Sequence, residues 1–198
     1  MPRQARIVIP DVSHHVIQRG NRRQDVFFGE EDYKTYLLLL KEACEKAGIR
    51  AQAYCLMSNH VHLVVVPSEE FGLRPIGEAH RRYTLYMNMK KDWRGYLWQG
   101  RFGSYPMDES YCYEAVRYVE LNPVRAGLCD HPCDYRWSSA RQRVNRAGAK
   151  GDFKVAPCLA IDDWETYWQD GLLKYEMIKQ FDDNEHSLRA MGTALGTQ

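Results

Sequence analysis

Apolar residues gather in short stretches of this chain beside turn signals, and along three longer segments they recur at helical spacing. Short runs of this kind are typical of strands, whereas the longer period is typical of helices. The predicted strands are residues 14–19, 49–56 and 60–66, with a fourth strand after a loop within 97–107. The predicted helices are residues 30–47, 72–93 and 109–122. Gly48 follows the first helix, and Pro123 is expected to end the third at the preceding residue.

The order of these elements is strand–helix–strand–strand–helix–strand–helix. It predicts an α+β domain in which helices cover an antiparallel sheet. We expect this domain to occupy residues 1–141, followed by a flexible polar connection over 142–157. Residues 158–198 are predicted to be a small acidic helical appendage, in which Asp162 and Asp163 precede the helix and Trp164 and Trp168 share a face.

Composition places the chain among ordinary soluble globular proteins, with 198 residues, 44% hydrophobic and 27% charged. The N-terminus has no apolar stretch behind a basic start, and no run approaches the roughly 20 apolar residues of a spanning helix. We therefore expect a cytoplasmic protein without a membrane partner. The six cysteines show no Cys-x-x-Cys spacing, and the single cluster of Cys129 to Cys133 is weak support for a zinc site.

The net charge of +1 conceals an uneven distribution. Residues 1–154 carry 24 Lys and Arg against 18 Asp and Glu, whereas residues 155–198 carry 3 against 8. A basic body with an acidic tail favours a polyanion as the partner of the body. A solvated charged surface explains a difference of this size equally well.

Two histidines, His60 and His62, begin the apolar run of the third predicted strand. Being two residues apart in a strand, they project from the same face, while Val61 points to the other. Two neutral imidazoles side by side are a start for a metal site. A lone His-x-His is more often an ordinary half-buried pair, so another element has to complete the site.

The helix predicted over 109–122 supplies polar groups for that purpose. Its apolar stripe consists of Cys112, Ala115, Val116 and Val119. Off this stripe, Glu114, Tyr118 and Asn122 form a row at a spacing of four residues. A phenol and an amide oxygen one turn apart would lie beside the two imidazoles, although any single tyrosine among 13 is more often a core or boundary aromatic.

Several blocks of the chain resemble the single-tyrosine HUH transposases, in particular the REP-associated tyrosine transposases. In chain order, the blocks are His15–Gln24, Cys55–Val64, Leu97–Phe102, Arg117–Leu128 and Trp137–Arg141. The resemblance extends to about residue 141. It implies an HUH-endonuclease fold with a ferredoxin-like or RRM-like core.

The resemblance also implies the chemistry. Tyr118 would be the nucleophile that cleaves single-stranded DNA, leaving a 5′-phosphotyrosine and a free 3′-hydroxyl that can later reseal the strand. His60 and His62 would bind a divalent metal, Mg²⁺ or Mn²⁺. Asn122 stands where related enzymes place a third polar ligand, often Gln. Tyr111 and Tyr113 are the nearby rivals of Tyr118.

The implied partner is single-stranded or hairpin DNA of the kind found in REP elements, bound by a monomer or a homodimer. Arginine suits phosphate contacts and stacking on unpaired bases. The candidate DNA contacts are Arg19, Asn21, Arg22 and Arg101, and also Arg81 and Arg82. Arg81 and Arg82 are explained equally well as the solvated face of a helix.

Two other functions compete with a transposase. A nucleotide hydrolase of the histidine-triad kind needs a third histidine two residues after His62, where this chain has Val64. A binder of structured single-stranded DNA without catalysis is the stronger rival, but it has no need of Tyr118 and both histidines together. Their joint presence favours the enzyme.

Overall fold

The computed structural model describes residues 7–69, 72–144, 153–157 and 159–174. These residues belong to two compact units, one ending at Ala160 and the other beginning at Ile161. Each unit is described by itself below.

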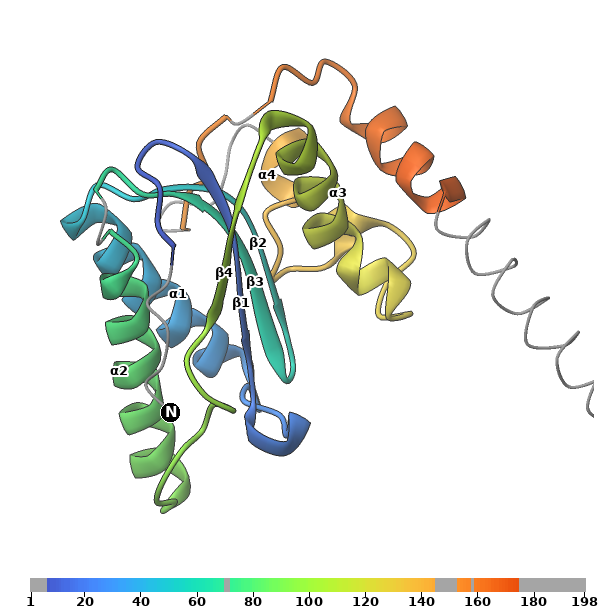
Figure 1. The fold of residues 1–198 in the computed structure, drawn as a ribbon. Coiled ribbons are helices and arrows are strands. Elements are labelled where there is room, and N and C mark those ends of the chain that lie inside the picture. The colour runs from blue at the N-terminus through green and yellow to red at the C-terminus, as the bar shows by residue number, and fades with distance from the viewer. Residues whose placement is uncertain (1–6, 70–71, 145–152, 158, 175–198) are drawn as a thin grey trace, which may run out of the picture. The chain divides into compact units, whose positions relative to one another are not determined.

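The first unit is built on a four-stranded antiparallel sheet in the order β2-β3-β1-β4 (Figure 1). Its strands are β1 (Ser13–Arg19), β2 (Arg50–Met57), β3 (His60–Val66) and β4 (Gly103–Met107). Its helices are α1 (Glu30–Lys46), α2 (Arg74–Lys91), α3 (Glu109–Arg125) and α4 (Arg141–Val144), with short 3-10 turns η1 (Asn21–Arg23) and η2 (Pro132–Asp134). α1 and α2 cover one face of the sheet and α3 covers the other. The predicted α+β fold is confirmed.

The face under α1 and α2 carries the main hydrophobic core. Along β3, Val61, Leu63 and Val65 point to this face and are almost completely buried. The two helices supply the large side chains that meet them: Tyr36, Leu40, Ile76, Tyr83 and Met87. Because side chains alternate along a strand, this core directs His60 and His62 to the face under α3.

α3 lies on the other face with its apolar stripe against the sheet. Cys112, Ala115, Val116 and Val119 are all buried, as the spacing predicted. The helix begins where expected, because the Asp108 side chain accepts a hydrogen bond from the Tyr111 backbone N–H at 2.7 Å.

The predicted end of this helix at residue 122 is wrong, because α3 continues through Pro123 to Arg125. The N–H groups of Ala126, Gly127 and Leu128 donate to the carbonyls of residues 122, 124 and 123. Gly127 has φ of +68°, which is the left-handed conformation that ends many helices. Pro123 is buried, so packing outweighs its local preference, and Gly127 performs the terminating role that the sequence pattern assigned to Pro123.

The edge of β2 is covered by residues 137–139. The Leu56 N–H donates to the Trp137 carbonyl and the Ser139 N–H donates to the Tyr54 carbonyl, both at 2.9 Å. These bonds extend the sheet ladder by a short antiparallel bridge between Cys55 and Ser138. At the other edge of the sheet, the part of the chain that the structure describes adds no strand beyond β4.

The first unit extends past residue 141, where the sequence pattern placed the domain boundary. The side chain of Arg143 is only 6% exposed and forms an ion pair with the buried Glu120 of α3 at 2.9 Å. Phe153 joins the core of the α1/α2 face, and the Ala156 N–H donates to the Ala51 carbonyl at 2.7 Å. Residues 142–144 and 153–157 are thus integral to the fold, while 145–152 of the predicted connection lie outside the described residues.

In the second unit, residues 164–174 are helical, as predicted. Asp163 caps this helix, accepting hydrogen bonds from the backbone of Glu165 and Thr166. The rings of Trp164 and Trp168 lie 5.8 Å apart between centroids, which confirms their shared face. The rest of the predicted appendage, residues 175–198, lies outside the described residues. Within the described ranges of either unit, no helix combines the length and apolar character that crossing a bilayer requires.

Candidate active site

The two histidines of β3 lie side by side on the α3 face, at the end of the strand where the chain turns from β2. Their ring centroids are 4.9 Å apart. His60 Nδ1 is held by the Asn59 side-chain oxygen at 2.6 Å. His62 is almost fully buried, whereas His60 is partly exposed. The alternation of β3 therefore produces the pair that the sequence predicted.

Tyr118 of α3 reaches the same place. Its ring meets His62 edge-on, with 5.5 Å between centroids, and remains 42% exposed. The guanidinium of Arg125 lies over the Tyr118 ring at 5.1 Å. The structure thus brings a solvent-accessible phenol from α3 against the imidazole pair of β3.

The two neighbours of Tyr118 in its helical row differ in their surroundings. Asn122 lies one turn later on α3 and is partly buried. Glu114 lies one turn earlier, and its carboxylate accepts a hydrogen bond from Arg117 at 2.8 Å. Glu114 therefore already serves an ion pair, which argues against a role as the base that assists Tyr118.

A third histidine, which was not among the predicted site residues, completes the cluster. His15 of β1 lies 3.0 Å from His62 between Nε2 and Nδ1, and its ring centroid is 6.2 Å from that of Tyr118. Its neighbour His14 points to the opposite face, where Nδ1 bonds the Val12 carbonyl. Alternation in β1 separates the two histidines, but only the pairing of β1 with β3 shows which one reaches His62.

Burial keeps these imidazoles neutral. It lowers the pKa of His15 and of His60 to about 4, with the positive charge of Arg19 also acting on His60. The pKa of His62 falls to about 3, first through burial and then through the neighbouring charges of His15, His60 and Arg19. Near neutral pH all three rings are therefore neutral, and each has one nitrogen lone pair for a metal or a hydrogen-bond donor.

The hydrogen bonds of His60 and His62 fit a metal ligand pair. Each ring is held through Nδ1, by Asn59 and by His15, and among the described residues no hydrogen bond is made at Nε2 of either ring. Ligand histidines characteristically use one nitrogen for the metal and the other for an orienting partner. Within the described ranges no three His, Cys, Asp or Glu side chains form a metal site, so this pair needs Asn122 or substrate and water oxygens to complete one.

Some of the predicted DNA contacts lie at the same end of the sheet as the two histidines. Arg19 is the cross-strand partner of His60, and η1 follows directly with Arg22 and Arg23 exposed. The Asn59 side chain donates to the Arg23 carbonyl at 3.1 Å, which fastens this turn beside the histidines. Gly20 permits the close approach, because a β-carbon there would lie 2.2 Å from the Gln24 carbonyl oxygen.

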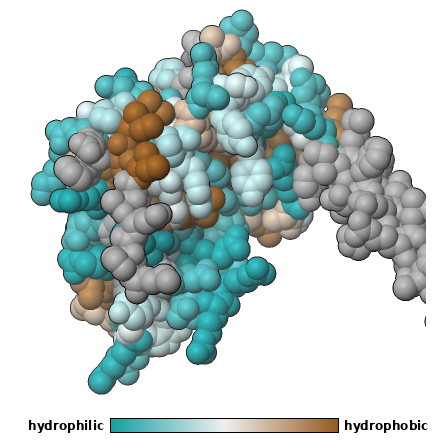
Figure 2. Space-filling model, viewed as in Figure 1, coloured by the Kyte–Doolittle hydropathy of each residue, from teal (hydrophilic) through white to brown (hydrophobic). Residues whose placement is uncertain are grey.

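The loop that precedes β4 is hydrogen-bonded to the residues at the end of β1 and the start of η1. The Asn21 N–H donates to the Leu97 carbonyl at 2.8 Å, and the Gln99 N–H donates to the Arg19 carbonyl at 2.9 Å. Arg101 follows in this loop and is exposed. Figure 2 shows that the surface over η1 and the C-terminal end of α2 is largely hydrophilic. Four of the predicted DNA contacts, Arg19, Asn21, Arg22 and Arg101, thus belong to two connected segments.

Arg81 and Arg82 are not brought to this site. Both lie on α2, on the opposite side of the sheet from α3. Arg81 forms a two-pronged ion pair with Glu78, at 2.6 and 2.8 Å, and Arg82 pairs with Glu42 at 2.6 Å. These bonds fit the alternative in which both arginines belong to a solvated helix face.

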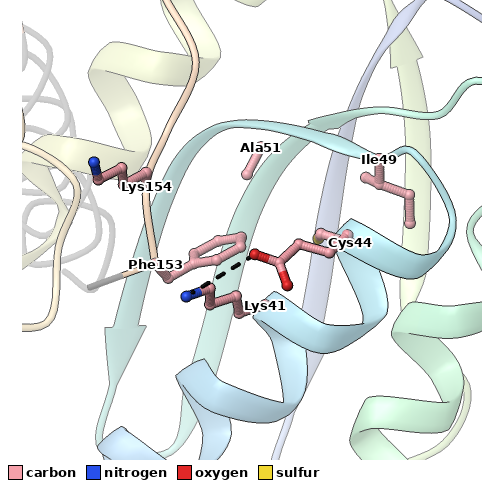
Figure 3. A pocket seen from close by; sticks show the side chains of 7 residues that line it. Lys41, Cys44, Ile49, Ala51, Phe153 and Lys154 are labelled. Atoms are coloured by element: carbon pink, nitrogen blue, oxygen red, sulfur yellow. Dashed lines mark ion pairs between the residues drawn. The ribbon is translucent and has the colours of Figure 1, made fainter. Parts of the chain in front are cut away.

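A cavity of about 400 Å³ lies between α1, β2 and residues 153–154 (Figure 3). Lys41 and Glu45 pair at its wall with 3.9 Å between charged atoms, and Phe153 lies beside them. The one thiol in the lining, Cys44, has a pKa raised to about 12 by burial. The cavity therefore holds neither an imidazole nor a reactive nucleophile, unlike the site under α3.

Comparison with known proteins agrees with this geometry. The model of the family described as "Transposase IS200 like" matches residues 8–122, which is more than half of the chain and spans β1 to α3. This chain therefore belongs to the IS200-like transposase family. No curated protein sequence matches it.

The fold is also that of a solved relative. The structure of a REP-associated tyrosine transposase bound to a REP hairpin has a TM-score of 0.61 and 17% identity, covering 82% of this chain and 96% of the other. A crystal structure assigned to a transposase of Deinococcus radiodurans has 21% identity over 60% of this chain, but its TM-score of 0.41 supports no argument. The family and the fold of the sequence-based prediction are thus confirmed.

Proposed function

We propose that this transposase cleaves and rejoins single-stranded DNA beside a hairpin, using Tyr118 as the nucleophile and a divalent metal held by His60 and His62. The observation that carries the proposal is the contact of the exposed Tyr118 ring with His62 of the imidazole pair, 5.5 Å between ring centroids. The Tyr118 ring contributes little to the free energy of unfolding, because 42% of its surface remains in solvent.

The Tyr118 oxygen attacks the phosphorus of a DNA phosphodiester. The bond from phosphorus to the 3′-oxygen of the preceding nucleotide breaks, and that oxygen takes up a proton to leave as a 3′-hydroxyl. The phenol proton passes to solvent, because the one lone pair of neutral His15 accepts the hydrogen bond from Nδ1 of His62 that leaves Nε2 of His62 for the metal. The resulting 5′-phosphotyrosine conserves the bond energy, so that a 3′-hydroxyl can later displace Tyr118 and reseal the strand.

Nε2 of His60 and of His62 would hold the metal, with the Asn122 amide as a third protein ligand. When bound, Mg²⁺ or Mn²⁺ would neutralise phosphate charge and polarise the phosphoryl oxygen. Asn59 bonds Nδ1 of His60, and His15 bonds Nδ1 of His62. These two hydrogen bonds keep the rings in position. Imidazole nitrogen favours Mn²⁺ over Mg²⁺, so we expect Mn²⁺ to support cleavage at least as well.

Single-stranded DNA with a hairpin is the proposed substrate. The solved relative of this fold is bound to a REP hairpin. In this chain, the basic segment that begins with Arg19 pairs directly beside His60 and continues into the exposed Arg22 and Arg23. Guanidinium groups at this position can contact the DNA backbone while the strand to be cut lies across the histidines.

The test is formation of a covalent adduct. Protein, Mn²⁺ and a labelled hairpin oligonucleotide with single-stranded tails are incubated and separated by denaturing electrophoresis, and the adduct is mapped by mass spectrometry. We expect the label on Tyr118. The Tyr118→Phe variant should bind the DNA and form no adduct, while the control Tyr113→Phe should form it normally.

Each other outcome contradicts the proposal. A label on Tyr111 or Tyr113 would move the nucleophile to another residue. DNA binding by the wild type without any adduct, over a panel of hairpins, would indicate a binding protein without catalysis. Full activity in excess chelator would remove the metal from the mechanism.

We also propose that one chain completes its own site, because Tyr118 contacts His62 of the same chain. A mixture of His62→Ala and Tyr118→Phe proteins tests this arrangement. If each site is built from one chain, the mixture has no intact site and forms no adduct. Recovery of adduct formation in the mixture would show that the Tyr118 of one copy serves the histidines of another.

A further inference from the structure

A groove beside Tyr118 has no part in the mechanism derived so far. It lies between β4 and the first half of α3 and has a volume of about 360 Å³, within the roughly 300–1,000 Å³ typical of ligand pockets. Its lining includes His15, Tyr105, Tyr111, Glu114 and Tyr118. The groove is thus continuous with the site, since His15 and Tyr118 belong to both.

Two tyrosines of the groove are exposed without an obvious structural reason. Tyr105 of β4 is 58% exposed and Tyr111 of α3 is 71% exposed. Tyr105 is the cross-strand partner of His15, so both point to the α3 face. The ring of Tyr105 folds back over Gly103, where a β-carbon would lie 3.1 Å from the ring. Glycine at this position therefore allows the ring to lie along β4 at the wall of the groove.

The chemistry of the lining selects a flat, uncharged ligand. Among the described residues that line the groove there is no Lys or Arg, so nothing in it attracts a phosphate. Three phenol rings and one imidazole offer π-faces and edges instead. The Glu114 carboxylate adds a hydrogen-bond acceptor whose charge is balanced by Arg117 at 2.8 Å. A nucleobase of single-stranded DNA combines a flat face with N–H donors on its edge, and it stacks on aromatic side chains.

We propose that the groove binds one unpaired nucleobase, that of a nucleotide flanking the phosphate attacked by Tyr118. This inference rests on the proposed function and extends it. A base stacked against Tyr105 or Tyr111 leaves its sugar-phosphate backbone at Tyr118, the residue shared by groove and active site. The groove thereby positions the scissile phosphate, while the basic turn after β1 holds a more distant part of the DNA.

Photo-crosslinking tests the position of the base without requiring cleavage. The Tyr118→Phe protein, in chelator, is mixed with a hairpin oligonucleotide whose thymidine tails carry one 5-iodouracil at successive positions. Near-ultraviolet light joins 5-iodouracil to an aromatic ring on which it is stacked. We expect one tail position to crosslink to Tyr105 or Tyr111. Crosslinks confined to the segments around Arg22 and Arg101 would overturn the inference.

Affinity provides the second measurement. Stacking is worth about 1–3 kcal/mol per base, so a Tyr105→Ala, Tyr111→Ala double variant should bind the tailed hairpin about 5- to 150-fold more weakly. The Tyr105→Phe, Tyr111→Phe variant keeps the rings and should bind as the wild type does. Tyr113→Ala is the matched control, because Tyr113 is on α3 but stacks with Arg117 outside the groove lining.

The outcomes separate this inference from the proposed function. Unchanged affinity of the double alanine variant would overturn the nucleobase groove, even if wild-type protein still forms the Tyr118 adduct. Loss of self-association in that variant, with DNA binding unchanged, would assign the groove to a second copy of the chain. Conversely, crosslinks at Tyr105 with no Tyr118 adduct in the wild type would preserve the groove and refute the catalytic proposal.

Discussion

The two faces of the sheet differ in how completely their side chains are buried and in how polar they are. Under α1 and α2, Val61, Leu63 and Val65 meet large helical side chains and exclude solvent. Under α3, His60 and His62 of the same strand meet a half-exposed tyrosine, and a groove remains open beside them. One strand of seven residues therefore contributes to the core with one set of positions and to the site with the other.

This difference shows how a small domain can hold a cluster of polar side chains in position beside solvent. The closed face supplies the hydrophobic stabilisation, so the face under α3 need not be filled completely. The imidazoles take their positions from the backbone of β3 and β1, which the core on the other face holds rigid. Substitutions on the two faces should therefore separate chemistry from stability.

The largest expected effect comes from His62→Ala compared with Leu63→Ala, its neighbour on β3. Removing His62 takes away a proposed metal ligand, so adduct formation should fall roughly 100-fold or more. Leu63→Ala leaves a cavity in the core and should lower the free energy of unfolding by about 2–5 kcal/mol, with adduct formation per folded molecule unchanged. Denaturant unfolding and the adduct assay measure the two quantities. Comparable adduct yields for both variants would contradict the division between faces.

A smaller effect is expected for His15→Ala. His15 positions His62 through the Nε2 to Nδ1 contact of 3.0 Å, and loss of such a partner costs about 10- to 100-fold in metal affinity. Mn²⁺ titration of adduct formation should show a higher metal requirement, which raised Mn²⁺ concentration partly restores. His14→Ala is the matched control on the opposite face and should leave the metal requirement unchanged. An unaltered Mn²⁺ titration for His15→Ala would exclude the positioning role.

Acid should destabilise the protein through the cluster under α3. Between pH 6.5 and 4 the unfolded chain protonates His62, whereas the folded chain, with a pKa of about 3 at His62, does not. The unfolded state therefore binds more protons, and stability falls as the pH falls through this range. We expect the contribution of His62 at pH 4 to be about 3 kcal/mol, because roughly 2.5 pH units separate pH 4 from the unfolded pKa and each is worth about 1.4 kcal/mol. Unfolding curves of wild type and His62→Leu should diverge with pH, and parallel pH profiles would contradict the prediction.

The smallest effects concern single DNA contacts. Arg22→Ala and Arg23→Ala should each weaken hairpin binding and lower the slope of log affinity against log salt by about 1, as loss of one phosphate contact does. Arg81→Ala and Arg82→Ala should leave affinity unchanged, because these side chains pair with Glu78 and Glu42 on the other side of the sheet. Binding measured over a salt series compares the two pairs. Equal losses for both pairs would extend the DNA interface to α2.

Local sequence pattern was sufficient for much of this architecture. A period of two in β3 placed His60 and His62 on one face, and the helical period of α3 placed Tyr118 off the buried stripe. Both inferences concern residues close in the chain, whose relative directions follow from backbone geometry alone. The order of the elements likewise predicted an antiparallel sheet with helical layers, because short connections favour neighbouring antiparallel strands.

Contacts between distant segments were decided by the tertiary structure. The register of β1 against β3 selects His15 rather than His14 as the partner of His62, and β4 aligns Tyr105 with His15. The buried packing of Pro123 lets α3 continue past it to Arg125. The ion pair between Arg143 and Glu120 makes Arg143 part of the first unit. Each of these outcomes depends on which surfaces meet after the chain folds. The periodicity of a single segment holds no information about that choice, whereas burial and hydrogen bonding between segments determine it.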